Sequence, residues 1–599
     1  MKRWNPCWIA LALTCVALPC LGCEGGDGDA DADTDSDMDA DADSDSDPVT
    51  RRYEYRGIAG FSMGGASAAF LGLRHPDEFD LIAPLGTSLN FTMYVNAMRR
   101  TFGGFCSPPE PDRMCPEGEF DYEHMNTDAP GAIGFERENY LDNTQDGVTA
   151  FGNTFLYNPD DPYLPPGVPR SYLALSRAEQ CNQPVVVENL FDRRFNPDGT
   201  LPAITFCDGN SDQPGVFDED GHNHKPVEVT LAIDLDGNGR RDSGEPVLMQ
   251  DREPFEDVGP DGLASTDEPG YDAASNPDPS GDDWHAEHNP LGREGDGRWQ
   301  EGEPYDDLGL DGVAGRGPHD LGEGNGRFDR NPAWDRFEAH DPHRLLQQAD
   351  LSRLDIYADV GLRDHLGFYE PSLSFAGVLR ELGRDVGVYR QFESLGGGRS
   401  YDPLKVDFND LERDVLLVYG DPDATPSEIN AGDGGHVGSP AQMLNRLLTA
   451  FKYASDRWPG GDREQVTGLA RSEQHSYVST AAGREIGYLI FLPPGYDREG
   501  TTYPVLYLLH GSGMAPGDLQ VADYLLEIYM ADGRLQKFIV VYPDGRCLPG
   551  ECNSGNFYVD QNGGWVDGRD YESAFVADLV DHVDATYKTK ASEEVEVSR

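Results

Sequence analysis

Basic residues, cysteines and long apolar runs are all scarce in this 599-residue chain. Lys and Arg number 47 against 108 Asp and Glu, which gives a formal net charge of −61 at pH 7. Nucleic-acid phosphates attract basic surfaces, so we expect no nucleic-acid partner. The acidic balance favours bound cations, a salty medium or simply a strongly solvated surface.

One apolar run lies at the N-terminus, and no other stretch of the sequence is long and apolar enough to suggest a membrane span. The N-terminal run spans Trp8–Leu18, follows a charged start and is too short to cross a bilayer as a stable helix, which is typical of a signal peptide. The following Cys20–Cys23 resembles a bacterial lipobox, with cleavage before Cys23 and a lipid on its thiol. Because Cys20 is unusual at that position, a plain secretory signal is the alternative. We expect export, with a lipid anchor in a membrane at the bacterial cell envelope or surface.

Cysteine is limited to ten residues, and the six that follow Cys23 fall into three close pairs. Even numbers of neighbouring cysteines in an exported chain predict local disulfides, although other pairings stay open. The predicted pairs are Cys106 with Cys115, Cys181 with Cys207, and Cys547 with Cys552. No histidine or second thiol pair recurs at the spacing of a zinc site, so structural zinc is disfavoured.

Composition divides the chain into segments of different character. Aspartate occupies every odd position from 27 to 47, and such a self-repelling run predicts a disordered tether. The predicted segments are a signal peptide (1–22), the tether (23–50), α/β core with a nucleophile turn (51–90), a loop-rich cap (91–227), an acidic calcium-binding repeat insertion (228–342), α/β core (343–457), a linker (458–476) and α/β core (477–599).

A candidate nucleophile lies at Ser62, within the run Gly60–Gly65. A short buried strand precedes the run and a helix with small residues follows it, as in the G-x-S-x-G turn that exposes a serine between a strand and a helix. Its position is unusual, because only the leader and the tether precede it. The strands that ordinarily come before such a serine must lie elsewhere in the chain, be absent, or come from another chain.

A serine needs a base, and the base needs a carboxylate. In chain order, Asp364 follows a strand and His436 lies in a glycine-rich loop before a helix, which matches the Ser, Asp, His order of α/β-hydrolases. Asp423 is a rival acid, although it lies only thirteen positions before His436. Asp359 is a weaker third candidate, and a surface-loop role for His436 is the alternative to a catalytic one.

Residues 477–599 carry buried-strand patterns and the run His510-Gly511-Ser512-Gly513. Together with the strand end at Val541–Gly545, Tyr571-Glu572 and Gly60–Gly65, this run resembles the esterase D family of α/β-hydrolases. The family includes S-formylglutathione hydrolases, feruloyl esterases and mycolyltransferases. The resemblance covers about 51–90, 350–456 and 477–599, and it implies a mostly parallel sheet flanked by helices. Backbone amides of Met63 and Ser512 would then hold the oxyanion.

The order of the segments departs from that family, whose members run from the equivalent of 477–599 into the nucleophile turn. The two pieces here are complementary, which predicts a circular permutation with 457–476 joining the old ends. The competing interpretation is two incomplete hydrolases in tandem or a chimaeric reading frame. Permutation requires Ser512 to lie close to Ser62.

A twelve-residue calcium loop is predicted at 234–245 within the acidic insertion. Its candidate ligands are Asp234, Asp236, Asn238, Arg240, Asp242 and Glu245. Glycine-rich acidic units recur after it, as in Gly244-Glu245-Pro246 and Gly302-Glu303-Pro304. A low-complexity insertion without metal is the alternative. We expect Ca²⁺ as a structural ion and no cofactor in catalysis.

The sequence therefore predicts an exported serine esterase that cleaves carboxylic esters, of small molecules or linked to carbohydrate, through an acyl-enzyme on Ser62. Two alternatives remain. One is a non-catalytic surface protein that binds calcium or carbohydrate on a hydrolase scaffold, and the other is an acyltransferase of the mycolyltransferase type.

Overall fold

The computed structural model describes residues 55–93, 252–309, 322–330, 338–398 except 365, 401–546, 558–560 and 570–590, with short stretches between 167 and 248. All of them lie in the second of two compact units, Glu54–Arg599. The predicted signal peptide, tether and lipidation site at Cys23 lie outside the described residues, as do the six paired cysteines.

A nine-stranded sheet forms the centre of this unit. The strand order is β10-β11-β13-β12-β1-β2-β7-β9-β8, and all neighbours run parallel except β11, which is antiparallel to both of its partners. The strands are β1 (Arg56–Phe61), β2 (Leu81–Leu85), β7 (Asp355–Gly361), β8 (Val386–Arg390), β9 (Asp414–Tyr419), β10 (Arg471–Ser479), β11 (Arg484–Leu492), β12 (Val505–Leu509) and β13 (Ile539–Pro543). This sheet, with helices on both faces, confirms the predicted α/β-hydrolase class of fold.

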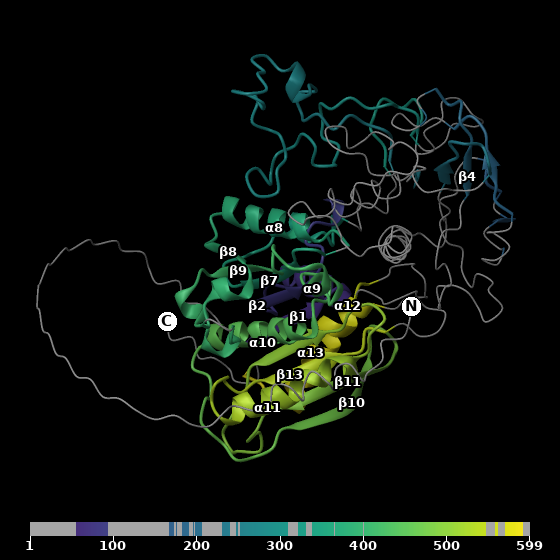
Figure 1. Cartoon of the computed structure of the whole chain (residues 1–599). Coiled ribbons are helices and arrows are strands. Elements are labelled where there is room, and N and C mark those ends of the chain that lie inside the picture. The colour runs from purple at the N-terminus through teal and green to yellow at the C-terminus, as the bar shows by residue number, and fades with distance from the viewer. Residues whose placement is uncertain are drawn as a thin grey trace, which may run out of the picture. The chain divides into compact units, whose positions relative to one another are not determined.

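The first strand of the described chain lies in the middle of the sheet, not at an edge. Figure 1 shows purple β1 and β2 between the green strands β7 to β9 and the later strands β11 and β13. Strand β1 pairs in register with β12 on one side, from Arg56 opposite Val505 to Gly60 opposite Leu509, and with β2 on the other. Four strands from 471–543 thus form the part of the sheet on one side of β1, where a hydrolase of this type ordinarily has the strands that precede its serine.

Two helical layers cover the sheet (Figure 1). The strand residues alternate between them: Ile58 and Ile82 pack with one layer, whereas Ala59 and Ala83 pack with the other. The first layer holds α2 (Met63–Arg74), α7 (Pro342–Leu346), α8 (Tyr369–Glu381), α12 (Tyr571–Ser573), the π-helical turn η8 (Ala574–Leu579) and α13 (Val580–Thr586). The second holds α10 (Pro440–Arg457), the 3-10 helix η7 (Pro516–Ala522) and α11 (Asp523–Ala531).

Five shorter helices lie in the connections. They are α9 (Pro426–Asn430), η3 (Ser265–Asp267), η4 (Phe392–Leu395), η5 (Pro403–Lys405) and η6 (Phe408–Asp410). Helix α10 begins at a capping box, in which the Ser439 hydroxyl accepts from the Gln442 amide and the Gln442 side chain accepts in return. This cap fixes where the loop that carries His436 ends. None of the described helices combines the length and apolar character needed to span a bilayer.

A second, antiparallel sheet lies in the predicted cap and insertion. It has the order β3-β4-β5-β6 and consists of β3 (Val186–Val187), β4 (Ala203–Thr205), β5 (Leu231–Ile233) and β6 (Val247–Leu248). Pairing of β4 with β5 joins residues on the two sides of the predicted boundary at 227/228. Similarly, β10 begins at Arg471, inside the predicted linker 458–476.

The repeated acidic units pair with each other. The first unit contains Glu253-Pro254-Phe255 and the second contains the similar Glu303-Pro304-Tyr305. An antiparallel bridge joins Phe255 to Tyr305. The carboxylate of Glu303 accepts the amides of Val258 and Gly259, whereas that of Glu253 accepts the amide of Gly309 in the other repeat. The internal repetition seen in the sequence thus corresponds to two interlocked units.

Candidate active site

Ser62 stands between β1 and α2 with φ 51° and ψ −117°, a backbone conformation that L-residues rarely adopt. Two glycines permit the turn. A Cβ atom at Gly60 would lie 2.2 Å from the carbonyl oxygen of Gly64, and one at Gly64 would lie 2.5 Å from the carbonyl oxygen of Leu509. The G-x-S-x-G spacing therefore meets a steric requirement, and its last glycine contacts β12.

His436 lies between Ser62 and Asp364. Its Nε2 atom is 2.9 Å from Ser62 Oγ, and its Nδ1 atom is 2.9 Å from Asp364 Oδ2. Asp364 is fully buried, and its other oxygen accepts the amide of Leu366 at 2.9 Å. An imidazole held this way can accept the serine proton while the carboxylate stabilises the resulting cation, so the arrangement suits nucleophilic catalysis.

The two rival acids are placed differently. Asp423 is exposed in the turn after β9. Asp359 is buried in β7, but both of its oxygens bind the guanidinium of Arg446, at 2.9 and 2.7 Å. The structure thus brings Asp364 to His436, as the sequence analysis favoured.

Arg446 is a fully buried residue that the sequence analysis missed. Its Nη1 atom donates to the carbonyl groups of His436 and the next residue, at 3.2 and 2.9 Å. Its guanidinium also lies 4.9 and 4.5 Å from the ring centroids of Phe61 and Tyr419. Burial alone would lower the pKa of Arg446, but the Asp359 carboxylate outweighs burial and raises it. The signal that could have revealed Arg446 is its position, as a charged residue, in the apolar stripe of α10.

The predicted oxyanion donors lie on the two sides of the serine. Met63 follows Ser62 directly and is buried at the start of α2. From β12, a Cβ atom at Gly511 would lie 3.4 Å from Ser62 Cβ, so the backbone that leads into Ser512 runs beside the nucleophile. The predicted permutation requires Ser512 to lie close to Ser62, and Gly511, the residue before Ser512, lies beside Ser62.

His510 holds this loop in place. Its Nδ1 atom lies 2.9 Å from the Gly511 carbonyl oxygen, and its Nε2 atom accepts the amide of Gly545 at 3.0 Å. Burial lowers the pKa of His510, which favours the neutral imidazole that both contacts require. The end of β12 is thereby tied to the end of β13.

The predicted calcium loop is only partly described. Asp234 is buried, and its carboxylate accepts the amides of Gly237, Asn238 and Gly239 at 2.7 to 3.1 Å. Asp236 is joined to Asn238 by two hydrogen bonds of its carboxylate. The other predicted ligands, Arg240, Asp242 and Glu245, lie outside the described residues.

Sequence comparison links the C-terminal part of the chain to esterases. Residues 479–597 match the "Putative esterase" family model. An esterase of Mycobacterium tuberculosis is 30% identical over 117 residues, which cover 20% of this chain and 24% of that protein. An endo-1,4-beta-xylanase/feruloyl esterase of Xylanibacter ruminicola is 28% identical over 126 residues, 20% of this chain and 16% of its own length. The chain thus spans less than a quarter of these relatives, and the predicted relationship to esterases is confirmed over that segment.

Solved structures match at lower sequence identity. A ferulic acid esterase from Anaeromyces mucronatus is 24% identical, with 21% of this chain and 47% of that chain covered and a TM-score of 0.17. A PHB depolymerase from Penicillium funiculosum is 10% identical, with 42% of this chain and 78% of that chain covered and a TM-score of 0.22.

Proposed function

We propose that this chain, with an esterase-related segment at 479–597, is a serine esterase that uses Ser62, His436 and Asp364. The observation that carries the proposal is the continuous hydrogen-bonded series from Ser62 Oγ through His436 to Asp364, with 2.9 Å at each step. The three residues come from distant parts of the sequence and follow β1, β7 and β9, which run in the same direction in the central sheet. Relatives named as esterases support the reaction class.

In the proposed mechanism, Ser62 Oγ attacks the ester carbonyl as His436 Nε2 takes its proton. The amides of Met63 and Ser512 would hold the negative oxygen of the tetrahedral intermediate. His436 then protonates the leaving alcohol, which leaves an acyl group on Ser62. Water, activated by the same imidazole, releases the acid and restores the serine. Transfer of the acyl group to another acceptor would use the same residues, and feruloyl or other sugar-linked esters are the first substrates to test.

Activity of variants on short p-nitrophenyl esters tests the proposal. Ser62→Ala should reduce kcat by about 10⁴-fold or more, because the covalent step is lost. Asp364→Asn should reduce it by about the same order, whereas Asp423→Asn, the matched change in the exposed rival, should have little effect. Ser427→Ala, in exposed α9, controls for serine removal. Unchanged activity of Ser62→Ala, or no labelling of Ser62 by a fluorophosphonate, would favour a non-catalytic protein.

We also propose that the chain order is a circular permutation of the usual hydrolase order. In support, Lys590 Nζ lies 3.9 Å from the centroid of the Tyr55 ring, so the end of the described chain adjoins the start of β1. Between them, Tyr503 accepts the Lys590 amide at 3.0 Å and β12 pairs with β1.

Reconnecting the chain tests this order. A protein that begins at 471, joins 590 to 55 through a short Gly/Ser linker and ends at 470 keeps the buried Trp458 and the Asp462 partner of Lys537, and it should fold and cleave the same esters. The same protein with Ser62→Ala is its control. A rearranged chain that stays unfolded under conditions in which the original order folds would contradict the permutation.

Export, a lipid on Cys23, three disulfides and Ca²⁺ at 234–245 are further proposals that rest on sequence signals. Mass spectrometry of the protein from membranes, digested with and without reduction, checks the lipid and the disulfides. The buried Asp234, with its three amide contacts, supports an ordered loop, and Asp234→Asn should lower the number of bound Ca²⁺ by one.

A further inference from the structure

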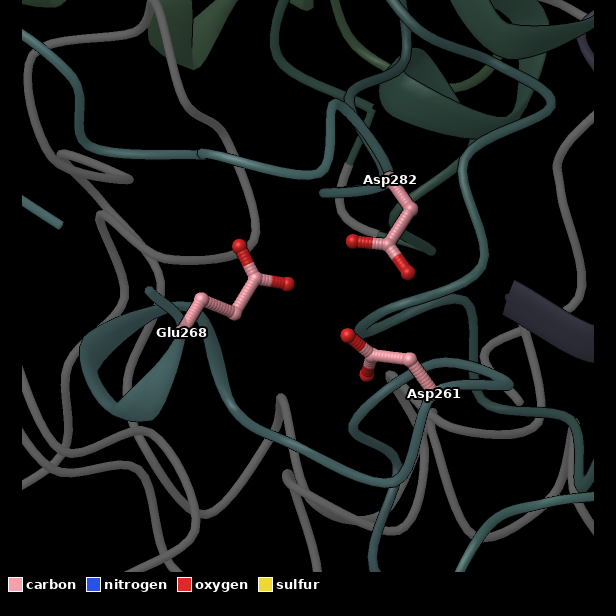
Figure 2. Close-up of side chains that lie close together, drawn as sticks. All are labelled: Asp261, Glu268 and Asp282. Carbon is pink, nitrogen blue, oxygen red and sulfur yellow. The ribbon is translucent and has the colours of Figure 1, made fainter. Parts of the chain in front are cut away.

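Three carboxylates meet in the acidic insertion, away from the predicted loop at 234–245. Asp261 lies in the turn at 259–262, Glu268 follows η3, and Asp282 lies in the next loop. One oxygen of each lies within 4.8 Å of an oxygen of the other two. Figure 2 shows the three side chains directed toward a common space.

Glu268 is the residue that indicates a ligand. It is only 5% exposed. Its Oε2 atom accepts the amide of Ser280 at 2.9 Å, whereas its Oε1 atom has no hydrogen-bond partner among the described residues. A buried carboxylate oxygen without a donor costs about 1–3 kcal/mol or more, so such atoms are normally satisfied by water or an ion.

The charge around the cluster is not balanced by protein. In the described part of the chain, no Lys, Arg or His forms an ion pair with Asp261, Glu268 or Asp282. Asp261 accepts the Leu263 amide at 2.9 Å, and Asp282 accepts the Ser280 hydroxyl. Among the described residues, the three carboxylates thus lie close together with neutral donors and no cation paired to them.

We propose that Asp261, Glu268 and Asp282 bind one Ca²⁺ ion. Calcium–oxygen bonds are 2.3–2.6 Å long, so two oxygens on one ion are separated by at most about 5 Å, which accommodates the 4.8 Å limit. Three carboxylates supply up to six oxygens, and water can complete a shell of six to eight. The set contains no thiolate or imidazole, which disfavours zinc.

The loop geometry leaves room for this arrangement. A Cβ atom at Gly259, where φ is 75°, would lie 2.2 Å from Asp282 Oδ2. Glycine at this position therefore lets the Asp282 carboxylate approach the turn that carries Asp261.

The site would connect three loops that otherwise hold little regular structure. The third loop continues to Ala286 and Glu287, which contact the core. A Cβ atom at Gly377 in α8 would lie 2.7 Å from the carbonyl oxygen of Ala286. The Oε1 atom of Glu287 lies 2.7 Å from Nη2 of Arg390. Bound Ca²⁺ would thus stabilise the face of the insertion that packs on α8. This role is separate from ester cleavage, since none of the three carboxylates contacts Ser62, His436 or Asp364 in the described structure.

Calcium titration of the purified whole protein tests the assignment. The protein is stripped with EDTA, freed of chelator and titrated with CaCl₂ by calorimetry. Glu268→Gln keeps the size of the side chain and can still accept the Ser280 amide. Asp261→Asn changes an exposed residue, and its amide oxygen can still accept the Leu263 amide. Asp267→Asn is the control, because it removes the same charge from the same turn outside the cluster.

We expect Glu268→Gln and Asp261→Asn each to bind one Ca²⁺ fewer than wild type, or to bind it at least about tenfold more weakly. Both should also lose part of the rise in Tm that Ca²⁺ gives, and Asp267→Asn should behave as wild type. The proposal is overturned if both cluster variants bind as many Ca²⁺ as Asp267→Asn with the same affinities. It is also overturned if equimolar Mg²⁺ displaces Ca²⁺ from the site that these variants remove.

Discussion

Two buried carboxylates of the hydrolase core and two carboxylates of the acidic insertion are satisfied in different ways. In the core, Asp359 on β7 faces the guanidinium of Arg446, and Asp414 on β9 faces Arg384 at 2.6 Å. In the insertion, Glu303 and Asp257 face backbone amides: Glu303 accepts three of them, and Asp257 accepts those of Gly295 and Gly297.

The difference follows from the local backbone. In the core, strands and helices already pair most backbone groups, so Asp359 and Asp414 have an opposite charge as partner. Asp80 is held instead by the amide of Tyr55 and the indole of Trp458. In the insertion, little of the backbone is in strands or helices, and its amides are free to bind side chains. In the insertion, carboxylates therefore accept hydrogen bonds from backbone amides that would be paired with carbonyl groups in a regular sheet or helix.

The largest expected effect comes from removing the positive partner in the core. Arg446→Met should destabilise the protein by about 3–5 kcal/mol, because Asp359 is left buried without a counter-ion. It should also lower kcat, since the carbonyl of His436 loses the Arg446 donor and keeps the Tyr419 hydroxyl. Urea unfolding and ester hydrolysis measure the two effects. Arg380→Met, on the exposed face of α8, is the control.

A loss below about 1 kcal/mol in Arg446→Met would show that core carboxylates do not depend on their cations. In that case the contrast with the insertion would fail. Addition of Ca²⁺ should not rescue Arg446→Met, because the affected pair is in the core.

The sequence was enough to predict the elements whose signals are local or follow from chain order. Ser62 is predictable because the G-x-S-x-G turn is a local pattern. Asp364 and His436 are predictable because the Ser, Asp, His order along the chain limits the candidates for the acid and the base. Arg446 was not found, because its role depends on Phe61 and Asp359 meeting it from other elements. The calcium site at Glu268 was also missed, since its three ligands follow no fixed spacing and are brought together only by loops.

A smaller effect concerns pH, and its sign differs between Asp257 and Glu303 of the insertion and Glu572 of the core. Burial raises the pKa of Asp257 to about 8, with Asp296 adding to it, and raises that of Glu303 to about 7. Groups with raised pKa values contribute stability that is complete below their unfolded pKa, near 4, and is lost as pH rises through 7 to 8. Without Ca²⁺, the insertion should therefore lose a few kcal/mol between pH 5 and 8.

The core carboxylate Glu572 should show the reverse. Burial alone would raise its pKa, but hydrogen bonds from His340 and His75 and the charge of Arg74 lower it to about 2. Its contribution is present above the unfolded pKa of about 4.5 and is lost as pH falls through about 2. Hydrogen exchange at 252–309 and 570–590, corrected for intrinsic rates, measures both regions. If protection against hydrogen exchange changes equally in the two segments between pH 5 and 8, the comparison is contradicted.

The smallest expected effect comes from Glu303→Gln, which separates charge from hydrogen bonding. Glutamine is neutral at every pH and can still accept the amides of Val258 and Gly259, but its NH₂ group faces the amide of Gln300 and loses that bond. We expect a cost of about 1 kcal/mol at pH 5 in Ca²⁺-free buffer. At pH 8 the cost should vanish or reverse, because wild type then holds a buried charge that the variant lacks. Glu301→Gln, an exposed neighbour, should leave the pH dependence unchanged. If Glu303→Gln keeps the full pH dependence of wild type, another carboxylate of the insertion must carry it, with Asp257 the first to test.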